Sequence, residues 1–277
     1  MNNTLPAPDI FVYAASDGNS LGSALQSGAS LTTVEGSGGN ANLIISNTNG
    51  PAQVDPWAFV VVSGGSLPTL DTSFKKIGAG SFAFSGSNQG LELGYSQVQL
   101  SGTDPWTCEF WAKQTGTANY AHLCGHWTGA TSDRSWSFGI RSNQKYFFNH
   151  TNGSGSAQSQ EGSNTFTTSD FNYYSASYDG SQVFIHINGV HQNTISISGG
   201  FNDPASNVNF TLGVMDNLGD DFTGNIDMFR MRKIARYNAS AYTAPTSAHS
   251  SDSNTLNLTQ FDSDLTNSAS HSGTYGV

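Results

Sequence analysis

WTCEFWAKQ (residues 106–114) decides the fold, because its apolar side chains recur at every second position. Cys108, Phe110 and Ala112 would point to one side of an extended chain, and the residues between them to the other side. A period of two is typical of a β-strand with a core on one face, whereas an amphipathic helix repeats every three to four residues. The stretch therefore predicts a strand that packs against a hydrophobic core.

Similar runs lie on both sides of this strand, from residue 69 to residue 247. Turn residues separate them, and DGSQ (179–182) and the Asn-Gly pair at 188–189 are typical of hairpins. No stretch has three turns of helical periodicity, so we expect an all-β sandwich. The strands expected here are GSFAFSG (80–86), LELGY (91–95), WTCEFWAKQ (106–114), AHLCGHW (121–127), SWSFGIR (135–141), KYFFNH (145–150), YYSASYD (173–179), VFIHING (183–189), NFTLGV (209–214) and IDMFRMRK (226–233).

The N-terminal part is also rich in short apolar runs, and the charge of the chain divides it from the centre. All ten Lys and Arg lie between Lys75 and Arg236, while both flanks carry only acids. We expect three parts: a small β-rich assembly or attachment region over 1–66, the sandwich over 67–262, and a polar tail over 263–277. The four strands expected in the first part would make a sheet that is marginal by itself. They are IFVYAA (10–15), SLTTV (30–34), ANLIIS (41–46) and WAFVVVS (57–63).

Composition excludes two classes of partner. The formal net charge is -10, with Lys+Arg 10 against Asp+Glu 20. A nucleic-acid binder needs a basic surface to neutralise phosphates, and docking on anionic lipid needs one too. No apolar stretch is long enough to insert in a membrane. We therefore expect neither nucleic acid nor membrane insertion, and the N-terminal MNNTLPAPDIFVY does not have the pattern of a secretory signal.

The two cysteines, Cys108 and Cys124, are too few for a disulfide framework. A buried free thiol is the expectation for Cys108, since it lies in the alternating run. A Cys108–Cys124 bridge stays open as an alternative if their strands pair.

The order of motifs along the chain resembles the laminin G-like jelly roll of the concanavalin A-like lectin/glucanase superfamily. The resemblance covers about residues 69–262, and its style is that of domains in tailed-bacteriophage virion proteins. It implies a concanavalin A-like jelly-roll sandwich, and it gives no family for the first 66 residues. The matching motifs are GSFAFSG (80–86) before Leu91-Glu92-Leu93, Phe110-Trp111, Leu123 to Trp127, Ser135 to Ile140, DGSQVFIHINGV (179–190), FTGNIDMFRMRKIARY (222–237) and Ala244-Pro245-Thr246.

Catalysis is not expected, and no catalytic residue is predicted. Retaining glucanases of the superfamily need two carboxylates about 5–5.5 Å apart, and Glu109 stands alone in its strand.

Calcium is the metal that the residues favour, since one loop concentrates hard oxygen donors and Asp227 follows it; the alternative is a solvated turn. The expected calcium ligands are Asp216, Asp220, Asp221 and Asp227. A basic cluster could also bind an anion, or could pair with neighbouring acids: Arg230, Arg232, Lys233 and Arg236.

Carbohydrate binding is a further expectation, because exposed aromatic rings stack on sugar rings while amides fix the hydroxyl groups. The alternative for the tryptophans is a place in the core. The candidate residues are Tyr120, His122, His126, Trp127, Trp136, Tyr146 and Asn149.

Three functions follow from this sequence. The first is a non-enzymatic structural protein of a bacteriophage virion, a capsid decoration or a tail or fibre component. It would pair with other virion proteins and with copies of itself, and would display a lectin-like domain to host cell-surface polysaccharide on the virion surface. The second is a secreted or surface carbohydrate-binding module, which would be extracellular. The third, a glycan-degrading enzyme, would need a pair of carboxylates in a cleft.

Overall fold

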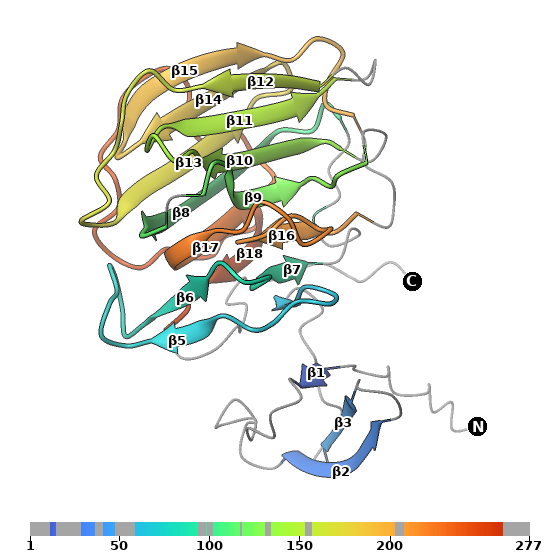
Figure 1. The fold of residues 1–277 in the computed structure, drawn as a ribbon. Helices are drawn as coiled ribbons and strands as arrows, with labels where there is room; N and C mark the ends of the chain where they lie inside the picture. Colours follow the sequence, from blue (N-terminus) through green and yellow to red (C-terminus); the bar gives the residue numbers. More distant parts are fainter. Residues whose placement is uncertain are drawn as a thin grey trace. The chain divides into compact units, whose positions relative to one another are not determined.

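The chain forms two compact units, Met1–Pro56 and Trp57–Val277 (Figure 1). In the described residues no helix is long and apolar enough to cross a membrane. The polar tail expected over 263–277 lies outside the described residues. The computed structural model describes three backbone strands in the first unit, and in the second it describes residues 59–93, 98, 102–116, 118–130, 134–152, 157–202 and 208–262.

The first unit contains an antiparallel three-stranded sheet in the order β1-β3-β2. Its strands are β1 (Val12–Ala14), β2 (Ala29–Gly36) and β3 (Ala41–Asn47). The fourth strand expected for this region belongs elsewhere: β4 (Val60–Val61) pairs with β7 (Leu91–Leu93) in the second unit. Phe59 and Val62, the two residues that flank it, are buried in the second unit. The boundary therefore falls before Trp57 and not at residue 66.

The second unit is a sandwich of two sheets made of antiparallel strand pairs, which confirms the all-β jelly roll (Figure 1). The seven-stranded sheet has the order β12-β11-β10-β9-β16-β7-β4. Its remaining strands are β9 (Ala121–His126), β10 (Trp136–Ile140), β11 (Tyr146–Thr151), β12 (Ala157–Glu161) and β16 (Phe210–Leu212).

The eight-stranded sheet has the order β15-β14-β13-β8-β17-β6-β5, and β18 also pairs with β17. Its centre is the pair β8 and β17, whose register places Cys108 opposite Met231. The strands are β5 (Thr69–Asp71), β6 (Ser81–Ser85), β8 (Trp106–Gln114), β13 (Asn172–Tyr178), β14 (Gln182–Ile187), β15 (Val190–Ser196), β17 (Thr223–Arg232) and β18 (Thr255–Thr259).

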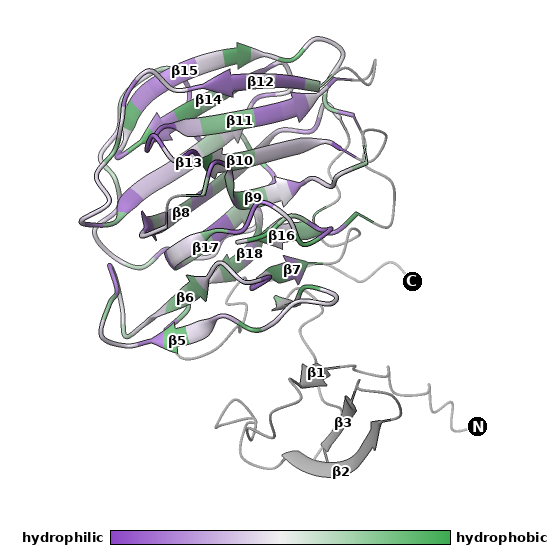
Figure 2. Ribbon diagram, viewed as in Figure 1, coloured by the Kyte–Doolittle hydropathy of each residue, from purple (hydrophilic) through white to green (hydrophobic). Residues whose placement is uncertain are grey.

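Aromatic side chains fill the space between the sheets. Trp106 of β8 stacks on Trp136 of β10 with ring centroids 4.4 Å apart. Phe110, four residues further along β8, meets Phe138 of β10 edge to face at 6.3 Å. These pairs join opposite sheets, so the alternation in each strand is what holds the sandwich together. The edge strand β12 is instead hydrophilic along most of its length (Figure 2), as suits an exposed edge.

A segment that we call the strap (residues 233–252) crosses the outer face of the eight-stranded sheet. Its Tyr242 N–H donates to the carbonyl of Gly189 over 2.9 Å. Gly189 lies in the two-residue turn between β14 and β15, where Asn188 has φ 53° and Gly189 has φ 76°. A hairpin of this type needs positive φ at both positions, which explains the Asn-Gly pair. The strap therefore buries a sheet face that would otherwise contact solvent.

Candidate functional site

The outer face of the seven-stranded sheet carries a row of polar residues with one glycine among them. Ser137 of β10 pairs with Asn149 of β11 and with Gly125 of β9. Thr211 of β16 pairs with Gly125 and with Glu92 of β7. The register thus aligns five residues across the sheet. Such a row would suit a sugar chain if it were open to solvent.

The centre of this face is not open. The loop over residues 213–222 follows β9, since the His122 N–H donates to the Asp220 carbonyl (2.7 Å) and the Asp216 N–H to the Trp127 carbonyl (3.2 Å). His122 is fully buried, and its ring nitrogens lie 2.9 and 3.1 Å from a serine and a threonine hydroxyl oxygen. Burial lowers the pKa of His122 to about 3. This histidine is therefore a neutral structural residue and not a surface contact for a ligand.

The acids of this loop attach it to neighbouring backbone. An Asp216 carboxylate oxygen accepts the Asn209 N–H over 3.2 Å, and an Asp221 oxygen accepts the Asn88 N–H over 3.0 Å. Burial raises the pKa of both carboxyl groups. These carboxylates hold the loop in place on the sheet.

The four expected calcium ligands are not brought together. Asp227 lies on β17 of the other sheet, where one oxygen accepts the N–H groups of Lys76 (2.8 Å) and Ile77 (3.0 Å). Burial raises the pKa of Asp227 to about 6. Across the described part of the chain, no three or more His, Cys, Asp and Glu side chains are grouped to hold a metal ion. The other three expected ligands belong to the loop between β16 and β17: Asp216, Asp220 and Asp221.

Most of the expected sugar-binding residues are buried. Trp136 and Tyr146 belong to the core between the sheets, because their neighbours in β10 and β11 take the outward positions. His126 is buried too, with Nδ1 3.3 Å from the Val208 carbonyl. The buried Trp127 ring has the guanidinium of Arg134 at 5.0 Å. The core alternative weighed for the tryptophans therefore holds for Trp136, and its side chain cannot reach a ligand outside the sandwich.

Tyr120 is half-buried and directly precedes the inner strand β9. The Arg141 guanidinium lies 4.1 Å from the centre of the Tyr120 ring, and its Nε lies 2.6 Å from a Glu161 carboxylate oxygen. Asn143 donates to the other Glu161 oxygen over 3.1 Å. The Glu161 side chain remains 35% exposed. An aromatic ring, a guanidinium, a carboxylate and an amide thus meet at one accessible place.

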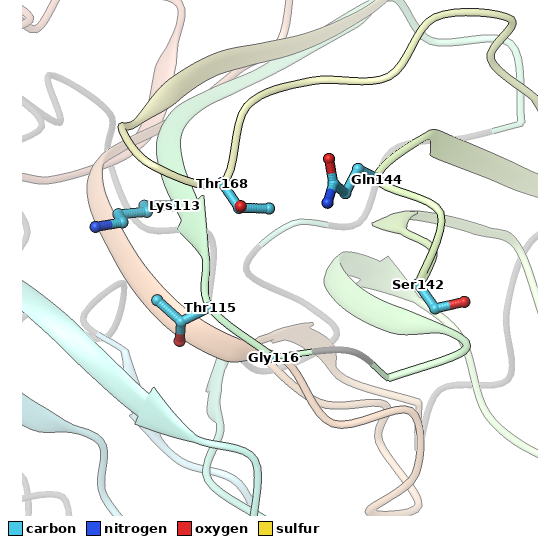
Figure 3. A pocket seen from close by; sticks show the side chains of 6 residues that line it. All are labelled: Lys113, Thr115, Gly116, Ser142, Gln144 and Thr168. Carbon is cyan, nitrogen blue, oxygen red and sulfur yellow. The ribbon is translucent and has the colours of Figure 1, made fainter.

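A pocket of about 310 Å³ lies beside this group, at the same end of the sandwich. Gln144 and Thr168 approach each other across it, whereas the Lys113 ammonium points away (Figure 3). The two features are neighbours because Ser142 directly follows Arg141 and contacts Asn119, which directly precedes Tyr120 (Oγ to Oδ1, 3.5 Å). The pocket is lined by Lys113, Thr115, Gly116, Ser142, Gln144 and Thr168.

We call this combined region the rim site: Tyr120, Arg141, Asn143 and Glu161 together with the pocket residues. Ring, hydroxyl and amide groups such as these are able to bind sugars by stacking and hydrogen bonding. Of the seven residues expected from the sequence, Tyr120 is the one in the rim site. Arg141 and Glu161 gave no sequence signal, since Arg141 directly follows β10, Glu161 ends β12, and the two meet only through the order of β10, β11 and β12.

Glu109, the carboxylate of the motif-rich strand β8, is fully enclosed. One oxygen lies 2.7 Å from Arg230 Nε and 2.5 Å from its Nη2, and the other accepts the hydroxyls of Tyr173 and Tyr237, each over 2.6 Å. Burial raises the pKa of Glu109, but Arg230 and the hydrogen bonds outweigh it and keep the pKa below its usual value. Glu109 is therefore a structural anion without access to a substrate.

The basic cluster considered for anion binding is largely committed to pairing. Arg230 is buried against Glu109, and Arg232 forms an ion pair with Asp252 of the strap. The Arg236 guanidinium lies 5.4 Å from the Tyr237 ring. Arg230 and Arg232, two of the four bases, thus pair with neighbouring acids, which is the alternative to anion binding. These two arginine side chains fix the strap to the sheet.

The sequence model of the "Concanavalin A-like lectin/glucanases superfamily" matches residues 85–240, which include the motif-rich strands and the residues Tyr120, Arg141 and Glu161. The chain belongs to this superfamily. The match confirms the resemblance to this superfamily that the motifs indicated. No curated protein sequence matches the chain.

Solved structures similar to this superfamily member are distant in sequence. The binding domain of Paraclostridial Mosquitocidal Protein 1 has 12% identity and a TM-score of 0.49, over 70% of this chain and 47% of that chain. The Ruminococcus gnavus IT-sialidase CBM40 bound to α2,3-sialyllactose has 16% identity and a TM-score of 0.46, over 57% and 88%. Domain 4 of a Geobacillus stearothermophilus arabinanase with arabinotriose has 17% identity and a TM-score of 0.47, over 62% and 77%.

Proposed function

We propose that this chain is a carbohydrate-binding domain without catalytic activity, and that it binds glycans at the rim site. The observation that carries the proposal is the arrangement of Tyr120, Arg141 and Glu161 beside a polar pocket in a member of a lectin superfamily. The half-buried ring offers a stacking surface for a sugar ring. The guanidinium, the carboxylate and the nearby amides offer donors and acceptors for hydroxyl groups.

Binding is favoured over hydrolysis because neither Glu109 nor Glu161 is free to take part in glycosidic cleavage. Glycosidases use two carboxyl groups on either side of the scissile bond. Glu109 has both oxygens occupied, and Glu161 is held by Arg141 and Asn143. The rim site therefore resembles a recognition surface more than a catalytic centre.

On this proposal the chain works where glycans are displayed, either outside a cell or on the surface of a virion. The narrower role in a tailed-bacteriophage capsid, tail or fibre rests on the sequence resemblance and stays a prediction. Mass spectrometry of purified virions from a host that carries the gene would test it. If the chain were absent from the particles, the role that remains would be that of an extracellular carbohydrate-binding module.

A glycan array tests the proposed function, with 3′-sialyllactose and arabinotriose included among neutral, sialylated and uronic-acid glycans. We expect binding of at least one class, with a dissociation constant that rises tenfold or more in Tyr120→Ala and Arg141→Ala. Isothermal titration with the best glycan gives that constant. The lost stacking surface and the lost donors are the physical reasons.

Arg134→Ala is the matched control, because Arg134 also lies beside an aromatic ring, that of Trp127, near the other end of β10. We expect this variant to bind as the unchanged chain does. Equal losses in Arg134→Ala and Arg141→Ala would assign the effect to general stability, and no binding across the array would overturn the proposal.

A further inference from the structure

The two cysteines face each other across the core of the sandwich. Cys108 lies on β8 of the eight-stranded sheet and Cys124 on β9 of the seven-stranded sheet. Both are fully buried as free thiols, and their Sγ atoms are 3.5 Å apart. Their strands do not pair, so the bridge weighed from the sequence would not be a cross-strand link within one sheet. It would join one sheet to the other.

Each cysteine lies on an inner strand of its sheet. The register places Cys108 between Ala176 of β13 and Met231 of β17. Cys124 lies between Phe138 of β10 and Leu212 of β16. A bond between the two sulfurs would therefore connect the sheets near their centres, where the aromatic core also holds them.

We propose that Cys108 and Cys124 are a redox-modification site, which closes to an inter-sheet disulfide when the chain folds with a disulfide oxidant present. The reaction with oxidised glutathione balances as an exchange. One thiolate attacks a glutathione sulfur and releases one reduced glutathione. The second protein thiolate then attacks the mixed disulfide, forms the Cys108–Cys124 bond and releases the second glutathione. Two thiol protons and two electrons leave the protein in total.

Folding is the stage at which closure occurs, because the folded chain shields both sulfurs. Attack requires a thiolate in contact with the oxidant, and neither sulfur is exposed after the sheets dock. Burial, and the neighbouring Cys124 thiol after it, also raise the pKa of Cys108. A chain that folds in reducing surroundings thus keeps its dithiol, and a chain that folds in oxidising surroundings keeps its bridge. The covalent form records the compartment of folding.

The bridge should stabilise the sandwich. The two cysteines are 16 positions apart in the sequence, and closing a loop of this size restricts the unfolded chain. The existing contact of 3.5 Å must shorten to the bond length of about 2.05 Å. The two sulfurs already lie at contact distance, and closing the remaining gap of about 1.5 Å requires movement of the side chains and of the two strands that carry them.

Oxidative refolding of the full chain tests the proposal. The unfolded, reduced chain is refolded with either oxidised or reduced glutathione, then denatured and treated with a maleimide, and its mass is measured. With oxidised glutathione we expect no label, a mass lower by that of two hydrogen atoms, and a peptide linking the two cysteines. With reduced glutathione we expect two labels. Treating the folded dithiol chain with oxidised glutathione should leave both thiols free.

Thermal unfolding supplies the second measurement, with a midpoint expected about 5–10 °C higher for the bridged chain than for the dithiol chain. The variant with both Cys108→Ala and Cys124→Ala is the control, and its midpoint should not depend on the glutathione used. Two labels, glutathione adducts or interchain dimers after oxidative refolding would overturn the proposal. A bridged chain that melts below the dithiol chain would overturn its stabilising role.

Discussion

His249 of the strap is a residue whose burial makes stability depend on pH. Its Nε2 lies 3.3 Å from the Tyr173 hydroxyl, and burial, with the nearby guanidinium of Arg230, lowers its pKa to about 4 despite the Glu109 carboxylate. The unfolded chain has the usual value near 6.5. The unfolded state therefore binds more protons in this window, so the stability from the neutral imidazole is present above about pH 6.5 and lost as the pH falls toward 4.

We predict that the free energy of unfolding drops by about 2 kcal/mol between pH 7.5 and 5.0 through His249 alone. Urea unfolding at the two pH values measures the drop. His249→Gln should reduce the pH dependence by that amount. An unchanged pH dependence in His249→Gln would contradict the assignment.

Polar residues whose partners are distant in the sequence show what the sequence could not predict. The strand around Glu109 was evident from local alternation, but its partner Arg230 is 121 positions away and was weighed as part of an anion site. The same applies to Arg141 and Glu161, which meet through strand order. Conversely, Trp136 and Tyr146 were candidates for sugar binding because residue type does not say which side of a strand faces the core. Side-chain chemistry is visible in the sequence, and its three-dimensional partner is not.

At the scale of elements, the strap covers the outer face of the eight-stranded sheet. Tyr237 and Tyr242 stack with centroids 3.9 Å apart, and the strap approaches the β14–β15 turn so closely that a Cβ atom on Gly189 would lie 1.9 Å from the Tyr242 carbonyl oxygen. The sequence predicted the strands on both sides of this turn, since periodicity is a local property. It did not predict the path of the strap, because loops follow long-range contacts.

We predict that Gly189→Ala destabilises the sandwich by roughly 2–4 kcal/mol, since it combines an unfavourable positive φ with displacement of the strap. Gly199→Ala separates the two causes, because Gly199 has the same φ of 76° and open space around it. That control should lose about 1 kcal/mol, which is the backbone cost alone. Chemical denaturation measures both variants. Equal losses would show that the strap does not press on the turn.

At the scale of the whole molecule, the two units differ in the interactions that stabilise them. The unit Trp57–Val277 contains both sheets of the sandwich and an aromatic core of its own. The described part of Met1–Pro56 is one three-stranded sheet. A sheet this small is marginal in water unless another surface covers it. Its strands also leave edges that can pair with a second chain.

We therefore predict that the full chain self-associates through residues 1–56, whereas a chain that begins at Trp57 is a monomer with a cooperative thermal transition. Size-exclusion chromatography with light scattering gives the mass of both. Binding of several sandwich units in one assembly would raise the avidity for a glycan surface without any new contact at the rim site. If both chains are monomers, residues 1–56 do not drive assembly, and their sheet needs a partner of another sequence. If both are oligomers, the interface belongs to the sandwich, where the hydrophilic edge of β12 is an unfavourable place for it.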